Sequence, residues 1–349
     1  MSWQGIRGQD EVVERFRTAL AHHRLASTFL FVGPEGCGKR LLAHKLAQSF
    51  LCEVNPEEAL NPCGNCTACK QVLAGTHPDL DVIAKPEDKS SIPLEMLIGD
   101  KEHRMREGLC FRISLKPYSG RRKIAIIDDA DFLFHEGANC LLKTLEEPPP
   151  KSILILLGTS EQRQLPTIRS RCQVVRFQPL VPEDIAAILL AQHVTDDPAA
   201  AQQAAAIAEG SVAVATRMLD AELAEFRSEL LQSLSQTLLQ PAVLVKLVQT
   251  FVDGAGKESA AKKQRLKDAL GSATLFFRQL MLAASGASEA TPALRSWPYG
   301  AKASATAVDL CLEASTAVDA NASAANVLEW WADELATLQR TGTASLLSH

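Results

Sequence analysis

The sequence lacks the features of membrane and secreted proteins. It contains no run of about 18 uninterrupted apolar residues, so no membrane-spanning helix is expected. Residues 1–9 have no apolar core of the kind found in signal peptides, and the cytoplasm is the expected location. Basic residues are not in excess either, since 36 Lys and Arg stand against 41 Asp and Glu. This balance argues against a globally basic nucleic-acid-binding protein, although a local basic patch is compatible with it.

What is present is typical of a soluble globular chain of 349 residues with two or three domains. Nine cysteines without an export signal argue against a disulfide framework, and four of the nine crowd into residues 52–69. Apolar runs alternate with helical patterns up to residue 180, which predicts an α/β domain with a parallel sheet covered on both faces. The strands are expected at residues 28–32, 79–84, 110–115, 123–127, 153–157 and 173–177, and helices at 10–25, 41–51 and 138–145.

After residue 180 the strand pattern stops and alanine-rich helical patterns take over. The predicted division is a P-loop domain at 1–180 with a four-cysteine module at 52–69, a small helical domain at 181–221 and an all-helical domain at 222–349. Loops are expected near residues 253–258 and 285–300.

A phosphate-binding loop occupies Gly33 to Arg40, between the first expected strand and a helix. It matches G-x-x-x-x-G-K at Gly33, Gly38 and Lys39, with a further glycine at Gly36. Backbone N–H groups in such a loop bind phosphate oxygens, and Lys39 would reach the outer phosphates. The next position normally holds the Ser or Thr that ligates Mg²⁺, but here it holds Arg40. The loop is therefore expected to bind ATP and Mg²⁺ weakly or not at all, with an active ATPase using another magnesium arrangement as the alternative.

A second deviation also affects the residues expected to position Mg²⁺ and water for ATP hydrolysis. The strand at 123–127 ends in Asp128 and Asp129, which is the Walker B pattern, and Asp128 would lie beside the magnesium position. Most ATPases place Glu next, to activate a water molecule; Asp129 is one methylene shorter. Thr159 follows the strand at 153–157, where a polar residue could sense a γ-phosphate.

The cysteine cluster consists of Cys52, Cys63, Cys66 and Cys69. Two C-x-x-C steps share Cys66, and Cys52 can close a tetrahedron from the end of the preceding helix. Four sulfur ligands favour a closed structural Zn²⁺ site, with an iron–sulfur cluster as the alternative. The remaining cysteines lie in apolar or motif contexts and are expected to be ordinary core residues.

The motifs together resemble those of bacterial clamp-loader AAA+ subunits, and the resemblance is strong over residues 5–180. The segments that carry it occur in the family's order: Gly8-Gln9, Phe29 to Gly36, the four-cysteine insert, His77-Pro78-Asp79, Ala138 to Pro149 and Thr167 to Cys172.

The resemblance implies an AAA+ module with an inserted zinc module, a helical lid and a helical collar. It implies a clamp-loader subunit of the DNA polymerase III holoenzyme, which has DNA-directed DNA polymerase activity. The partners would be gamma/tau and delta subunits in a hetero-pentameric ring, the sliding clamp and primer–template DNA. Arg171 would act as an arginine finger on the ATP of a neighbouring motor subunit, and the four cysteines would bind zinc.

Three departures from the motor pattern favour the non-motor, delta-prime type within this family. They are Arg40, Asp129 and Ala213, which stands where a motor has an arginine in its lid helix. A gamma/tau-type ATPase motor is the first alternative. A small-molecule P-loop phosphotransferase is the second, but the cysteine module stands where a substrate-binding lid would be expected.

Overall fold

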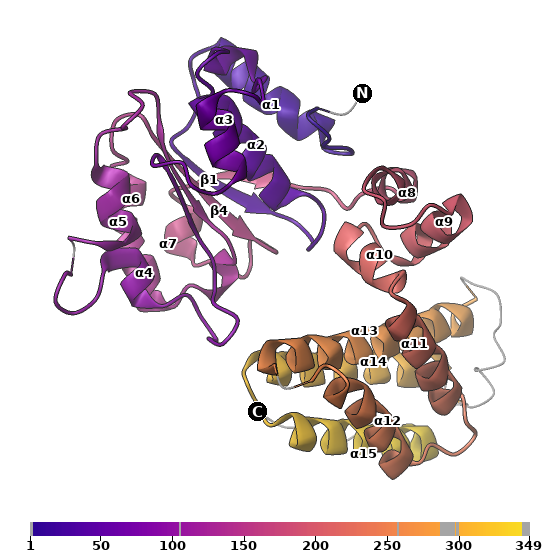
Figure 1. Ribbon diagram of the computed structural model, residues 1–349. Helices are drawn as coiled ribbons and strands as arrows, with labels where there is room; N and C mark the ends of the chain where they lie inside the picture. The colour runs from indigo at the N-terminus through magenta and orange to yellow at the C-terminus, as the bar shows by residue number, and fades with distance from the viewer. Residues whose placement is uncertain (1–2, 105, 257, 287–296, 298–299, 344–349) are drawn as a thin grey trace. The chain divides into compact units, whose positions relative to one another are not determined.

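The computed structural model describes residues 3–343 except 105, 257, 287–296 and 298–299. The chain forms two compact units, which divide between Leu219 and Asp220 (Figure 1). The division into three domains predicted from the sequence stays a prediction. Within the described residues, no helix is both long and apolar enough to span a bilayer.

The first unit is built around a five-stranded parallel sheet in the order β2-β3-β4-β1-β5. Every residue of the three central strands is buried, because helices cover both faces, and the polar residues Thr28, Lys123 and Ser152 stand only at the strand starts. The strands are β1 (Thr28–Val32), β2 (Leu80–Ile83), β3 (Lys123–Ile127), β4 (Ser152–Gly158) and β5 (Gln173–Arg176).

Alternation along each strand divides the core into two layers. In β1, Phe29 and Phe31 face one layer, while Leu30 and Val32 face the other. The surrounding elements are α1 (Asp10–Ala21), α2 (Lys39–Leu51), η1 (Glu57–Ala59), α3 (Thr67–Leu73), α4 (Leu94–Ile98), α5 (Gly108–Ser114), η2 (Ala130–Phe132), α6 (His135–Glu146) and α7 (Pro166–Arg169).

One predicted strand is wrong. Residues 110–115 fall mainly in the helix α5, whose buried residues include Leu109, Cys110 and Ile113. The i, i+1, i+4 spacing of these residues places them on one helix face against the core layer that contains Leu30. A short apolar run is ambiguous between the two structures, and here packing against the sheet decides for the helix.

Residues 182–218 form a cluster of three helices within the first unit. Their core consists of alanine, leucine and isoleucine side chains, including Ile185, Leu189, Ala205 and Ala215. The helices are α8 (Pro182–Ala191), α9 (Pro198–Ile207) and α10 (Val212–Met218), and the latter two begin at side-chain caps from Asp197 and Ser211.

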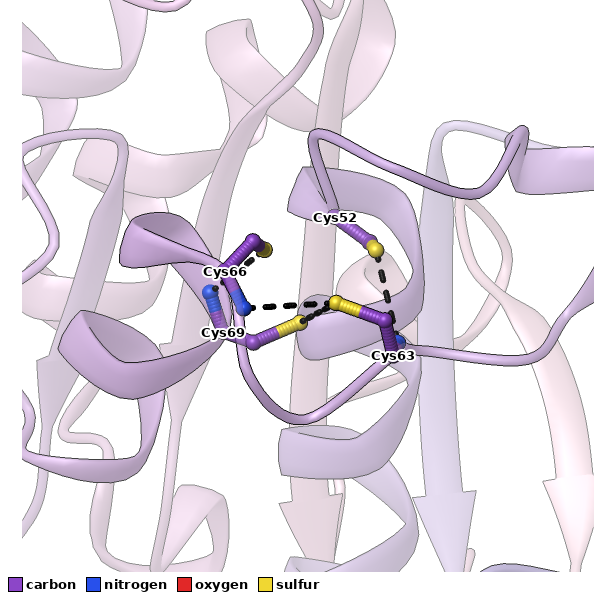
Figure 2. Close-up of side chains that lie close together, drawn as sticks. All are labelled: Cys52, Cys63, Cys66 and Cys69. Atoms are coloured by element: carbon purple, nitrogen blue, oxygen red, sulfur yellow. Dashed lines mark hydrogen bonds between the residues drawn. The ribbon is translucent and has the colours of Figure 1, made fainter.

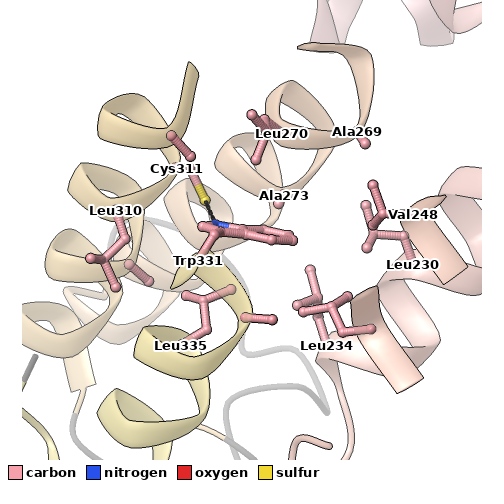
Figure 3. Close-up of a cluster of buried hydrophobic side chains, with 14 of the residues drawn as sticks. Leu230, Leu234, Val248, Ala269, Leu270, Ala273, Leu310, Cys311, Trp331 and Leu335 are labelled. Atoms are coloured by element: carbon pink, nitrogen blue, oxygen red, sulfur yellow. Dashed lines mark hydrogen bonds between the residues drawn. The ribbon is translucent and has the colours of Figure 1, made fainter. Parts of the chain in front are cut away.

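The second unit contains only helices among its described residues. They are α11 (Ala221–Leu234), α12 (Pro241–Asp253), α13 (Ser259–Ala284), α14 (Gly300–Asp319) and α15 (Ala324–Thr341). The interruption expected at 253–258 lies between α12 and α13, while most of the loop expected at 285–300 falls outside the described residues. Trp331 lies at the centre of the core, fully buried, with its indole N–H directed at Cys311 Sγ at 3.4 Å (Figure 3).

Replacing Trp331 with Ala is expected to destabilise the second unit by about 3–5 kcal/mol, because it removes a fully buried aromatic ring and leaves a cavity. Guanidinium denaturation followed by circular dichroism would measure this loss. Trp330, which is only partly buried beside it, is the matched control. An equal or larger loss for Trp330→Ala would contradict the packing described here.

Candidate nucleotide site and metal centre

The phosphate loop lies where the sheet presents the carboxyl ends of its strands. Because β3, β4 and β1 are adjacent and parallel, the residues that follow them meet at one edge. Those residues are Asp128 after β3, Thr159 after β4 and Gly33 after β1. The sequence motifs are therefore brought to one place by the strand order.

Glycine is required in this loop for conformation and for close approach. Gly36 and Gly38 have φ values of 72° and 97°, and Gly38 immediately precedes α2. At Gly33, an added Cβ would lie 2.7 Å from the carbonyl oxygen of Phe177. The result is a strand–loop–helix turn with the positive end of α2 at its mouth.

Both cations of the loop have partners within the chain. Lys39 Nζ donates to the carbonyl oxygens of Gly33 and Pro34, each at 2.6 Å. Arg40 Nε lies 3.0 Å from Asp128 Oδ2. Arg40 thus places a guanidinium against the carboxylate that was predicted to lie beside magnesium.

Asp129 occupies the position where most ATPases have Glu, and its backbone and its neighbour Asp128 define its surroundings. Its backbone adopts the left-handed region, with φ 56°, and its N–H donates to Asp128 Oδ1 at 3.0 Å. Burial, together with the negative charge of Asp128, raises the pKa of Asp129. These contacts hold the two carboxylates at the strand end, where only Asp128 is paired with Arg40.

Thr159 is held by Asp131, a carboxylate to which the sequence motifs assign no role. Its N–H and hydroxyl both donate to Asp131 Oδ2, at 2.8 and 2.6 Å. Gln164 Nε2 donates to the other oxygen of Asp131, whose side chain is almost fully buried. The Thr159 hydroxyl hydrogen is therefore engaged within the chain. In the sequence, Asp131 is the third acidic residue after the strand at 123–127, but no sequence pattern indicated its partners.

The N-terminus of α10 packs directly on the loop. Val212 N–H donates to the carbonyl oxygen of Gly36 at 3.1 Å, and a Cβ added at Gly36 would collide with Ser211 Oγ. Ala213 also lies against Gly36, since its backbone nitrogen would be 2.9 Å from that Cβ. Ala213, which stands where a motor would have an arginine, thus lies at the loop and carries no charge.

The side chain of Arg171 makes its contacts with residues outside the phosphate loop. Its guanidinium pairs with Glu146, with Nε to Oε1 at 2.7 Å and Nη2 to Oε1 at 2.5 Å. Nη1 donates to the carbonyl oxygen of Thr167 at 3.0 Å and lies 3.2 Å from Ser170 Oγ. The backbone is held separately, because Thr28 Oγ1 donates to the Arg171 carbonyl at 2.7 Å. Glu146 was not identified as a partner from the sequence.

The four predicted cysteine ligands converge (Figure 2). Cys52 follows α2, Cys66 caps α3, and Cys69 lies in the first turn of α3. One potential ligand atom from each residue lies within 4.8 Å of the others. A tetrahedral ion with bonds of about 2.3 Å would place its sulfur ligands about 3.8 Å apart, so the cluster is close to that geometry.

Backbone N–H groups donate to sulfur atoms of the cluster, and their effect on the pKa is largest at Cys52, whereas burial raises the pKa of Cys69. Cys52 Sγ accepts from the N–H groups of Asn55 and Cys63, both at 3.4 Å. Burial raises the pKa of Cys52, but these hydrogen bonds outweigh it and lower the pKa to about 6. The N–H groups of Cys66 and Cys69 donate in the same way to Cys63 Sγ and Cys66 Sγ. This donor set suits a cation that binds sulfur.

Comparisons with known proteins identify the family of the chain. Residues 8–181 match the family model described as DNA polymerase III, delta subunit. The chain is 32% identical over 227 residues to the DNA polymerase III subunit delta' of Pseudomonas aeruginosa, covering 65% of this chain and 66% of that protein. It is 35% identical over 196 residues to the subunit delta' of Bacillus subtilis, covering 56% of this chain and 55% of that protein.

Proteins named as tau or gamma/tau subunits are also among the relatives. The chain is 31% identical over 264 residues to the Escherichia coli subunit tau, covering 73% of this chain and 39% of that protein. The matches thus span about two fifths to two thirds of these relatives. A gamma subunit-related protein of Thermotoga maritima covers 94% of this chain at 15% identity, and this chain covers 99% of it, with a TM-score of 0.45. On the family match and the two delta' relatives, the chain belongs to the DNA polymerase III delta-subunit family.

Proposed function

We propose that the chain is a delta-prime-type subunit of a bacterial clamp loader, and that it serves the ATP site of a neighbour instead of its own. The observation that carries the proposal is the 3.0 Å ion pair between Arg40 and Asp128. It places the guanidinium of Arg40 where a P-loop ATPase holds Mg²⁺ through a hydroxyl and this carboxylate. Gly33, Gly36, Gly38, Lys39, Asp128 and Thr159 then form a degenerate nucleotide site.

The other contacts at the loop point in the same direction. Lys39 is bound to loop carbonyls, the Thr159 hydroxyl is bound to Asp131, and Ala213 offers no charge to a phosphate. Nucleotide binding would have to break several of these contacts and would still lack a magnesium ligand at position 40. The gamma/tau-type motor, the main alternative, would be expected to have Ser or Thr at position 40, Glu at position 129 and an arginine at position 213.

The remainder of the proposal follows the family. The first unit would be an AAA+ module with a lid at 181–221, and residues 222–349 would be the collar. The partners would be gamma/tau and delta subunits in a ring, a sliding clamp and primer–template DNA, in the cytoplasm. Arg171 would complete the ATP site of an adjacent motor, since an arginine can neutralise charge in the transition state of phosphoryl transfer.

We also propose a structural zinc ion at Cys52, Cys63, Cys66 and Cys69. Four sulfur ligands leave no open position for substrate, so the ion would hold the end of α2 to the start of α3 without taking part in a reaction. The N–H groups that point at the sulfur atoms would orient the ligands and stabilise their negative charge.

The isolated chain is expected to show no ATP turnover above background, because Arg40 and Asp129 remove the positioning of magnesium and water. A coupled phosphate-release assay with excess Mg²⁺ measures this. The Lys39→Ala variant is the control, because it would remove turnover by the loop but not turnover by a contaminating ATPase. Turnover at a motor-like rate that Lys39→Ala abolishes would show that the loop is an active site.

A further inference from the structure

Arg171 has almost no hydrogen-bonding capacity left in this structure. A guanidinium carries five N–H donors. One donor on Nε and one on Nη2 face Glu146, and the two on Nη1 face Thr167 O and Ser170 Oγ. A single N–H of Nη2 remains, which cannot form the paired hydrogen bonds by which arginine binds a phosphate.

The position of Glu146 explains why it holds an arginine. It is the last residue of α6, where the helix dipole disfavours a negative charge. The Pro148-Pro149-Pro150 segment prevents the helix from continuing. The α7 carbonyl of Thr167 adds a second acceptor to the same guanidinium. Arg171 therefore neutralises two helix ends of its own chain.

We propose that Glu146 is a latch that holds Arg171 within its own chain until the triphosphate of a neighbouring subunit replaces the carboxylate. This inference rests on the proposed finger role of Arg171. A triphosphate offers more negative charge and more acceptors than one carboxylate, so the exchange is favourable when the neighbour is loaded. Without the triphosphate, the arginine stays with Glu146, which couples its release to the neighbour's ATP.

The latch is weak enough to open. The side chains of Arg171 and Glu146 are 32% and 49% exposed, so solvent screens the pair. Ion pairs of this kind shift an equilibrium by about two- to fivefold. The Glu146→Gln variant keeps the size of the side chain and removes its charge, so it should release Arg171 by that factor.

The first test uses the isolated chain and needs no partner. Phenylglyoxal modifies accessible arginines, and mass spectrometry locates the products. Arg171 should react about two- to fivefold faster in Glu146→Gln than in the wild type, while Arg169, which is exposed at the end of α7, should not change. Glu147→Gln, at the adjacent exposed position, is the matched control. Equal reactivity of Arg171 in all three chains would overturn the latch.

The second test uses the loader reconstituted with motor subunits, clamp and primed DNA. Glu146→Gln should lower the ATP concentration that gives half-maximal turnover by about two- to fivefold, and only when Arg171 is present. If Arg171→Ala leaves turnover unchanged, the finger role fails and the latch with it. If Arg171→Ala slows turnover and Glu146→Gln slows it too, the finger stands, Glu146 orients it, and the latch is wrong.

Discussion

Replacing Arg171 with Ala should slow ATP hydrolysis at the neighbouring motor site by about 10³-fold or more, the size of effect known for arginine fingers. The total DNA-dependent ATPase rate of the loader should fall by at least the fraction that this site contributes to it. The variant should fold normally, because the side chain is partly exposed and the bond from Thr28 Oγ1 goes to the backbone carbonyl. Steady-state phosphate release by a complex of verified composition measures the effect.

Arg169→Ala provides the control for Arg171→Ala. It removes an exposed arginine two residues away, at the end of the short helix α7, and should leave turnover close to that of the wild type. An unchanged rate for Arg171→Ala in an intact complex would remove the finger role. Equal losses for both variants would indicate a general electrostatic contribution of this helix.

The second large effect concerns the cysteine module. Replacing Cys63 with Ser, or removing the metal with a chelator, should cost several kcal/mol of stability, since structural zinc contributes about 10–16 kcal/mol of apparent binding free energy in small zinc-finger peptides. The loss should be smaller here, because α2 and α3 also pack against the large core layer that contains Phe50 and Val72. Thermal unfolding with and without chelator measures it.

Elemental analysis complements the unfolding experiment. The purified chain should contain zinc at near-unit stoichiometry, and Cys63→Ser should lose most of it. Cys140→Ser is the matched control, because Cys140 is similarly half-buried but lies outside the cluster. Absence of zinc, with all four thiols of the native chain reactive, would argue against the site; iron and sulfide in its place would establish the alternative cluster.

The features that could be predicted from the sequence are those whose residues lie close together along the chain. The strand at Thr28–Val32 is a continuous apolar run between loops, and its burial on both faces follows from that composition. The phosphate loop depends on glycines at fixed spacing, and the cysteine cluster on two C-x-x-C steps. In each case the residues that must act together lie within about twenty positions, so their spacing carries most of the geometry.

The missed features depend on contacts between distant residues. Residues 110–115 are apolar enough for a strand, and only packing against the sheet makes them a helix. Asp131 is separated from Thr159 and Gln164 by 28 and 33 residues, and Glu146 from Arg171 by 25. No spacing rule links such pairs. The sequence predicted that Arg40 would weaken the binding of ATP and Mg²⁺, but its pairing with Asp128 required the fold.

The central claim is that this chain has lost its own hydrolysis and serves a neighbour's. Its most direct test is ATP hydrolysis by a gamma/tau-type motor subunit with sliding clamp and primed DNA, after addition of the wild-type, Lys39→Ala or Arg171→Ala chain. The account predicts that the wild-type and Lys39→Ala chains stimulate the motor equally and that Arg171→Ala does not. Stimulation that is lost with Lys39→Ala and retained with Arg171→Ala would contradict it.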